Sequence, residues 1–225
     1  MSSGTSRRSF LGTALSVGAV AALMQARGFL QGRGWLDTAH AATVDLVHDT
    51  FNGLFAFVVP GSDAYSVEQG VSTPDPGGVD AGAADVFIAT VDESTPFIPS
   101  FSTQVAAILN GLAGAVNPAA DGPFVSPFAR LSFAEKTAVF QIMDGTDALK
   151  LLGGLLPPFV AFFTYSEAGV FDPATRSLTG TPLGWQLCNY QGAADGRDEF
   201  LGYFGTPVAN ASGSANSGEE KSCAT

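Results

Sequence analysis

A helix start signal at Ser132 is the feature that most constrains the fold of this chain. Ser132 is followed three residues later by Glu135, which is the spacing of a capping box. In that motif the serine oxygen and the glutamate carboxylate each bind a backbone N–H at the start of the helix. We therefore predict a helix that begins at Phe133 and ends at Gly145. Its predicted apolar face is Val139, Ile142 and Met143, and its predicted polar face is Glu135, Lys136 and Gln141.

Two consecutive prolines predict the start of a second helix. Pro157 and Pro158 suit a first helical turn, where the N–H groups that proline lacks would have no partner inside the helix. The predicted buried stripe of this helix is Phe159, Phe162 and Phe163. Two helices joined by a compact connection bury their apolar faces most simply as an antiparallel pair.

Three further stretches carry helical signals, and none of the chain alternates convincingly with the period of two that is typical of a strand. Apolar residues recur at helical spacing over residues 44–58, after Thr43 as N-cap. Another stretch begins at Ala83 and is short enough to be a helix or a buried strand; a helix is favoured because Asp85, Asp92 and Glu93 fall on its other side. A third is capped by Ser102 and ends at Asn117, which precedes a proline. The predicted fold class is mainly α: a single compact helical domain with long irregular loops.

Length and charge limit the domain organisation and the partners. The 225 residues suffice for one domain, which we place at residues 42–205, between an N-terminal leader (1–41) and a flexible polar tail (206–225). After residue 41 the chain has 6 basic and 20 acidic residues. Such a surface repels phosphate backbones, so nucleic-acid binding is excluded from the predicted functions.

The N-terminus matches a twin-arginine export signal. Arg7 and Arg8 are followed by Phe10 and Leu11 and then by an apolar run of Gly, Ala and Val. This run is shorter than the roughly 20 residues that span a bilayer. Ala39 and Ala41 are the small residues of a predicted cleavage site, so the mature chain would start near residue 42. The leader predicts export in the folded state to the periplasm, the cell envelope or the exterior.

The residues give little sign of catalytic or metal chemistry. Past the leader the only histidine is His48, and the chain has no nucleophile elbow, nucleotide-binding glycine loop or haem-attachment motif. Two pairs of aspartates, Asp144 with Asp147 and Asp75 with Asp80, lack the dense oxygen spacing of calcium loops. Glu167 lies in an apolar stretch and would be a candidate catalytic acid if buried. No cofactor is predicted for this chain.

The two cysteines, Cys188 and Cys223, are a candidate disulfide, since an exported chain meets an oxidising compartment. Folding before export argues against the bond, so both states stay open. A bridge would fix the tail near Trp185.

Several stretches, in order, resemble the gluconate 2-dehydrogenase subunit 3 family. They are FVVPGSDAYSVEQGV, DAGAADVFIATVDES, PFARLSFAEKTAVFQIM, FFTYSEAGVFDP and GWQLCNYQG, and together they span about residues 46–192. The chain departs from the family at 177–180, where the family tends to have Gly-Gly-Asn, and at 190–192, where its Tyr-Pro-Gly is Tyr-Gln-Gly. The resemblance implies a small helical, non-catalytic subunit that binds and stabilises an FAD-containing large subunit of the glucose-methanol-choline (GMC) type. It would escort that subunit through the twin-arginine translocase, and a cytochrome subunit is a further candidate partner.

The 18 phenylalanines suggest that some apolar side chains are covered by another protein. Two other functions stay open: an independent secreted enzyme that uses an acid such as Glu167, and an envelope protein whose interior binds an apolar ligand. The candidates for core or partner interface are Phe124, Phe128, Phe162, Phe163, Tyr165, Phe171 and Trp185.

Overall fold

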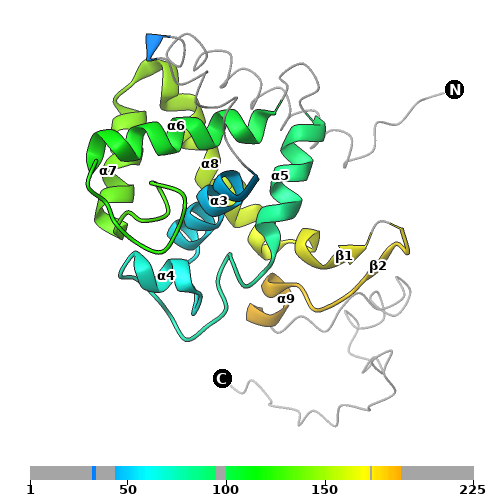
Figure 1. Cartoon of the computed structure of the whole chain (residues 1–225). Helices are drawn as coiled ribbons and strands as arrows, with labels where there is room; N and C mark the ends of the chain where they lie inside the picture. Colours follow the sequence, from blue (N-terminus) through cyan, green and yellow to red (C-terminus); the bar gives the residue numbers. More distant parts are fainter. Residues whose placement is uncertain (1–31, 34–43, 95–99, 173, 189–225) are drawn as a thin grey trace, which may run out of the picture. The chain divides into compact units, whose positions relative to one another are not determined.

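The computed structural model describes residues 32–33, 44–94, 100–172 and 174–188, which form a mainly α-helical fold, as predicted (Figure 1). Contacts divide the chain into two units, Met1–Leu183 and Gly184–Thr225. The predicted leader lies almost wholly outside the described residues, as do the predicted domain end at 205 and the tail. The elements are α3 (Val44–Val58), α4 (Ala64–Glu68), α5 (Ala83–Ser94), α6 (Phe101–Val116), α7 (Phe133–Asp144), α8 (Asp147–Tyr165), the 3-10 turn η1 (Ala168–Val170), the antiparallel strands β1 (Phe171–Asp172) and β2 (Ser177–Leu178), and α9 (Leu183–Leu187).

Helix α3 is the central element of the first unit and contacts α4, α5, α6 and α8 (Figure 1). Its residues Phe51 and Phe55 are fully buried, and both rings meet Phe87 of α5, at centroid distances of 5.3 and 5.8 Å. Phe87 in turn meets Phe163 of α8 edge-on at 5.2 Å. Four rings therefore join three helices in one core, and both the α3 and the α5 predictions are confirmed.

The capping box at the start of α7 is present as predicted. The Glu135 N–H donates to Ser132 Oγ at 3.4 Å, and the Ser132 N–H donates to Glu135 Oε2 at 2.9 Å. The bond from the Ser132 N–H, together with one from the Ser132 hydroxyl to the same carboxylate oxygen at 2.8 Å, lowers the pKa of the Glu135 carboxyl. α7 ends at Asp144 with Gly145 as C-cap, and it packs on α8. Within its predicted apolar face Ile142 is exposed, which is a correction.

Lys136 is a larger correction, because it was predicted on the polar face of α7 and is fully buried. Its Nζ donates to the Gly53 carbonyl of α3 at 3.2 Å and to Gln69 Oε1, just after α4, at 2.9 Å. The amine also lies 5.6 Å from the ring centroid of Phe128. Burial lowers the pKa of Lys136 to about 7, although the negative charge of nearby carboxylates acts in the opposite direction.

Helix α8 begins ten residues earlier than predicted, at Asp147, so Pro157 and Pro158 lie inside it. The predicted buried stripe is also wrong in part, since Phe162 is exposed and Phe159 only partly buried. A stripe from the earlier start packs inward instead: Leu149, Leu152, Leu156, Val160, Phe163 and Thr164.

Helix α6 begins one residue before its predicted cap. Ser100 is the N-cap but makes no side-chain capping bond, and Ser102 is a buried residue of the first turn. The carboxylate of Asp92, in α5, replaces the cap: it accepts from the Ser102 N–H at 2.8 Å and from Ser102 Oγ at 2.7 Å. The predicted C-terminus at Asn117 is confirmed.

Residues 61–82, between α3 and α5, contain α4, which packs back on α3. The Ser66 N–H donates to the N-cap Asp63 at 2.9 Å. Gly61 and Gly77 approach so closely that a side chain on either would collide with the backbone of the other.

We predict that Lys136→Met removes a pH dependence of stability. A lysine whose pKa is about 7 in the folded chain and about 10.4 in the unfolded chain binds fewer protons when folded over that interval. Wild-type stability should therefore rise with pH from about 7 to about 9.5, by at most about 1.4 kcal/mol per pH unit. Urea unfolding of both proteins at several pH values measures the difference, and parallel pH profiles would contradict the buried, proton-poor amine.

We also predict that Asp92→Ala destabilises the chain by about 1–2 kcal/mol, because it removes a helix-capping carboxylate and leaves buried Ser102 without this acceptor. Glu93→Ala is the matched control, since the side chain next to Asp92 is exposed. Equal unfolding midpoints in urea for the two variants would refute the capping role.

Candidate functional site: an exposed apolar face of helix α8

Helix α8 carries a second apolar stripe that faces solvent in the described structure. Five exposed residues, called here the α8 face, recur at steps of three, four, four and three residues, which places them along one side of the helix. The exposed fractions are 38% for Leu151, 54% for Phe162 and 41% for Tyr165. The α8 face is about 21 Å long at 1.5 Å per residue. It consists of Leu151, Gly154, Pro158, Phe162 and Tyr165.

A further exposed aromatic residue follows α8 in the sequence. Phe171, in β1, is 42% exposed and follows α8 after the η1 turn. The ring of Phe162 stands edge-on to buried Phe163 at 5.7 Å, so the exposed ring is supported by the core. An aromatic ring that is held in place by the core loses little conformational entropy when a partner covers it, which favours a binding surface.

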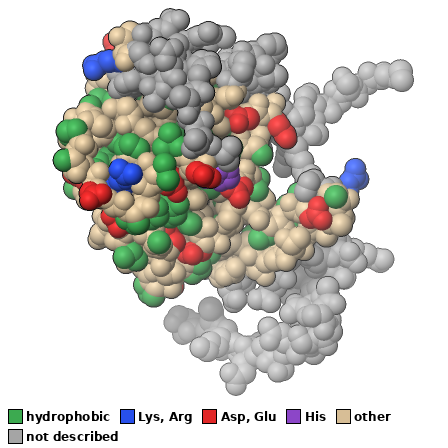
Figure 2. Space-filling view, in the orientation of Figure 1, with side chains coloured by type: hydrophobic (Ala, Val, Ile, Leu, Met, Phe, Trp, Pro, Cys, Tyr) green, Lys and Arg blue, Asp and Glu red, His purple; other side chains and the backbone are tan. Residues whose placement is uncertain are grey.

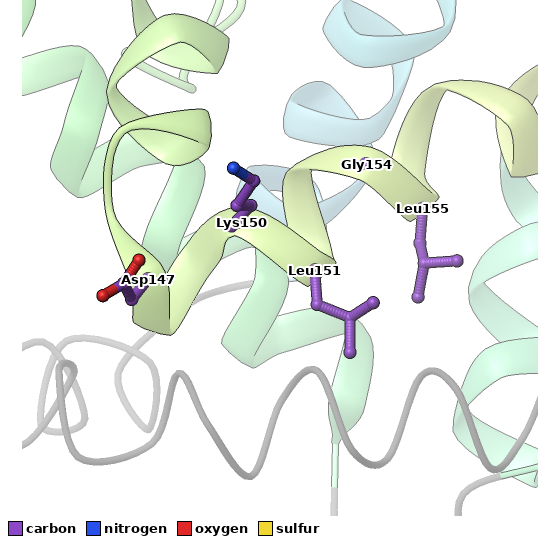
Figure 3. A pocket seen from close by; sticks show the side chains of 5 residues that line it. All are labelled: Asp147, Lys150, Leu151, Gly154 and Leu155. Atoms are coloured by element: carbon purple, nitrogen blue, oxygen red, sulfur yellow. The ribbon is translucent and has the colours of Figure 1, made fainter.

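A hollow of about 570 Å³, open to solvent, lies beside the first half of the α8 face (Figure 3). Leu151 and Leu155 supply apolar walls, and Asp147 and Lys150 supply charged groups. Gly154 lies between them without a side chain. The hollow can receive an apolar side chain that is surrounded by polar groups of the same partner.

Carboxylates lie near both ends of the α8 face. Asp147 and Asp144 are exposed near the first turn, where Lys150 lies 3.8 Å from Asp144, and Glu167 is exposed just beyond Tyr165. The carboxylates near the ends of α8 favour a partner with basic residues around its own apolar contact. Figure 2 shows a separate group of acidic side chains around the histidine, and that histidine, His48, lies on α3.

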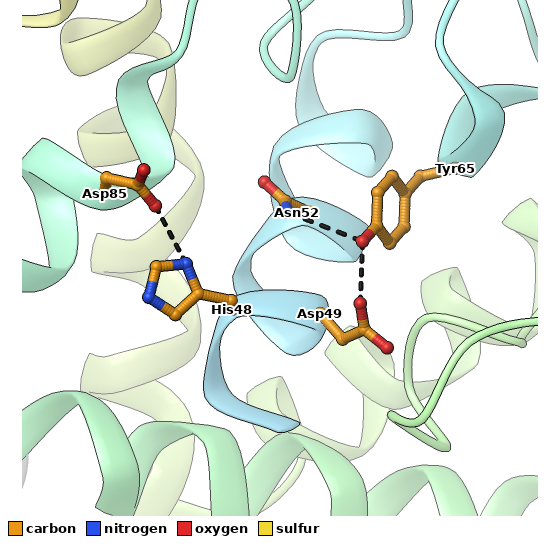
Figure 4. Close-up of polar contacts among 5 residues, drawn as sticks. All are labelled: His48, Asp49, Asn52, Tyr65 and Asp85. Atoms are coloured by element: carbon orange, nitrogen blue, oxygen red, sulfur yellow. Dashed lines mark hydrogen bonds and ion pairs between the residues drawn. The ribbon is translucent and has the colours of Figure 1, made fainter. Parts of the chain in front are cut away.

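The polar groups around α3 serve structural contacts (Figure 4). His48 Nδ1 lies 2.8 Å from Asp85 of α5. The Tyr65 hydroxyl donates to Asp49 at 2.7 Å, and burial, aided by this bond, raises the pKa of Tyr65 to about 12. Asp49 also accepts the Val125 N–H at 2.5 Å. The two bonds to Asp49 join α4 and the loop before α7 to α3, and the His48 contact joins α3 to α5.

Six of the seven predicted interface residues divide into three groups by burial, and Trp185 is described after them. Phe128 and Phe163 belong to the core, with exposed fractions of 0% and 7%. Phe124 is partly buried and its ring stacks on Tyr65 at 3.9 Å. The exposed ones are Phe162, Tyr165 and Phe171. Trp185 lies in α9, at the boundary of the second unit.

Leu151 and Gly154 were missed by the sequence analysis because the helix was predicted to start at Pro157, whereas Pro158 was placed in the predicted helix but not among the interface candidates. The apolar run before the prolines, LLGGLL, could have indicated the longer helix. By length and composition α8 could also cross a membrane. Of the 18-residue stretch of α8 that meets these criteria, 33% is buried in the structure. A core helix of a soluble protein meets the same criteria, and the inner stripe of α8 packs in the core.

Other predicted sites receive less support or lie outside the described residues. Glu167 is exposed, so it lacks the burial that would have made it a candidate acid. Among the described residues no group of three or more His, Cys, Asp or Glu could hold a metal ion. Cys188 is exposed, and its predicted bridge stays a prediction because Cys223 is outside the described residues. The export and cleavage residues also lie outside the described residues: Arg7, Arg8, Phe10, Leu11, Ala39 and Ala41.

Comparisons with known proteins add no identification: no family model matches the chain, and no curated protein or solved structure matches it. Membership of the gluconate 2-dehydrogenase subunit 3 family therefore stays a prediction from the resemblance of the sequence.

Proposed function

We propose that this chain is a non-catalytic accessory subunit that binds and stabilises a GMC-type flavoprotein dehydrogenase or oxidase and escorts it through twin-arginine export. The flavin would belong to the partner. The structural observation that supports a binding role is the α8 face, an apolar stripe on a helix whose opposite side is fixed in the core. The choice of partner comes from the family resemblance and the leader.

The size of the α8 face fits part of a protein interface. Stable interfaces bury about 800 Å² on each partner, and a single helix face about 21 Å long supplies only a fraction of that area. The partner would therefore also cover neighbouring surface, for which exposed Phe171 is the first candidate. Aromatic residues that are supported by a core are common energetic centres of such interfaces.

The two alternative functions have weaker support. A secreted enzyme that uses Glu167 would need that carboxylate in a pocket, whereas it is exposed. A binder of apolar ligands would need an enclosed cavity, whereas the hollow beside α8 is open to solvent.

We predict that Phe162→Ser weakens the complex with a GMC-type flavoprotein of the same organism. Removal of a supported aromatic side chain from the centre of an interface costs about 2–4 kcal/mol, or about 30- to 1,000-fold in affinity. Co-expression of both full chains followed by size exclusion, with flavin absorbance as the readout, measures assembly.

Val67→Ser is the matched control for this experiment, because Val67 is 62% exposed on α4 and is not part of the α8 face. The control should assemble normally. Assembly of Phe162→Ser at wild-type yield would exclude the α8 face, and failure of the wild-type pair to assemble would refute the accessory function.

We further predict that Arg7→Lys together with Arg8→Lys retains both chains in the cytoplasm, since the pair of arginines is the recognised part of the signal. Cell fractionation followed by flavin and antibody detection of both chains tests this result. Export of the flavoprotein with the variant would show that the escort role is wrong.

A further inference from the structure

We propose that Gly154 is the point on the α8 face where a loop of the partner protein docks, with one bulky apolar side chain in the hollow and one N–H donated to the Gly154 carbonyl. This inference rests on the proposed function and names the contact that the partner makes. It is carried by the backbone chemistry of α8 and by the space around Gly154.

The carbonyl of Gly154 lacks its ordinary helical donors. In an α-helix it would accept from the N–H four residues later, and in a 3-10 turn from the N–H three residues later. These residues are Pro158 and Pro157, and neither has an N–H. Gly154 is also an exposed residue, so an acceptor that lacks its helical donors belongs to an otherwise apolar stripe.

The glycine at 154 has no packing reason within the described structure. At the neighbouring Gly153 an added Cβ would lie 2.9 Å from Met143 Cβ, so that glycine permits the contact between α7 and α8. At Gly154 an added Cβ would meet nothing within 4 Å. A glycine inside a helix costs about 1 kcal/mol relative to alanine. Among the described residues no close contact at Gly154 offsets this cost.

The hollow beside Gly154 determines the chemistry of the occupant. Leu151 and Leu155 favour an apolar side chain. The rim has two charged residues, and because Lys150 already lies 3.8 Å from Asp144, exposed Asp147 is the one that favours a cationic residue. A second copy of this chain would bring one acidic surface against another, which is unfavourable. We therefore assign the hollow to a protein partner with a basic rim around an apolar contact.

The test compares Gly154→Leu with Gly114→Leu. Both variants are made in the full chain and are co-expressed with the same GMC-type flavoprotein that is used to test Phe162→Ser. Gly114 is the matched control because it is also exposed within a helix, α6, with nothing within 4 Å of an added Cβ. Both variants should have a Tm equal to or above that of wild type, since leucine is a better helix former than glycine. We expect Gly154→Leu to weaken the complex at least about tenfold and Gly114→Leu less than about twofold.

Each result decides between the proposals. If the wild-type complex forms and Gly154→Leu binds equally well, the docking point is wrong and the accessory function stands. If no wild-type complex forms, both proposals fail. If Gly154→Leu unfolds the chain, Gly154→Ala replaces it and should still weaken binding by about threefold relative to Gly114→Ala; equal binding of the two alanine variants would also overturn the inference.

Discussion

Burial of one side of α3 is the constraint on which the rest of the fold depends. Phe51 and Phe55 are inaccessible to solvent, and through Phe87 they determine where α5 and α8 lie. Each large ring buries roughly 150–250 Å² of surface, so this cluster supplies a substantial part of the hydrophobic stabilisation. Because the inner stripe of α8 is held by this cluster, the opposite stripe of the same helix must face outward.

Two buried polar contacts add specificity to this packing. The Lys136 amine joins α7 to α3 and to the segment after α4, since its acceptors are Gly53 O and Gln69 Oε1. Gly53 makes a second close contact, because an added Cβ would lie 2.9 Å from Ala129 Cα. A charged or polar group of this kind costs free energy to bury and is tolerated only with partners, so it penalises alternative packings in which those partners are absent.

Local signals in the sequence predicted local structure well, and long-range contacts explain the errors. The capping box of α7 and the apolar period of α3 are visible within one or two helical turns, and both were confirmed. Lys136 was placed in solvent because its acceptors are 67 and 83 residues away in sequence. The start of α8 was missed because Pro157 usually marks a first turn. Two of the five residues of the α8 face, Leu151 and Gly154, were lost with it, whereas exposed Phe162 and Tyr165 were recognised as candidates.

The two faces of α8 explain how a helix with internal prolines can serve binding. Each proline removes one backbone hydrogen bond, at a cost of about 3 kcal/mol or more in an isolated helix. Here Leu152, Leu156 and Val160 bury the inner side across the proline pair, so tertiary packing holds the helix together where backbone bonding is weakest. The outer side then combines apolar side chains with one carbonyl group, that of Gly154, which lacks its helical donors. A regular helix cannot offer this combination, because its carbonyls are bonded internally. An outside N–H that binds there would restore a bond that the sequence removed.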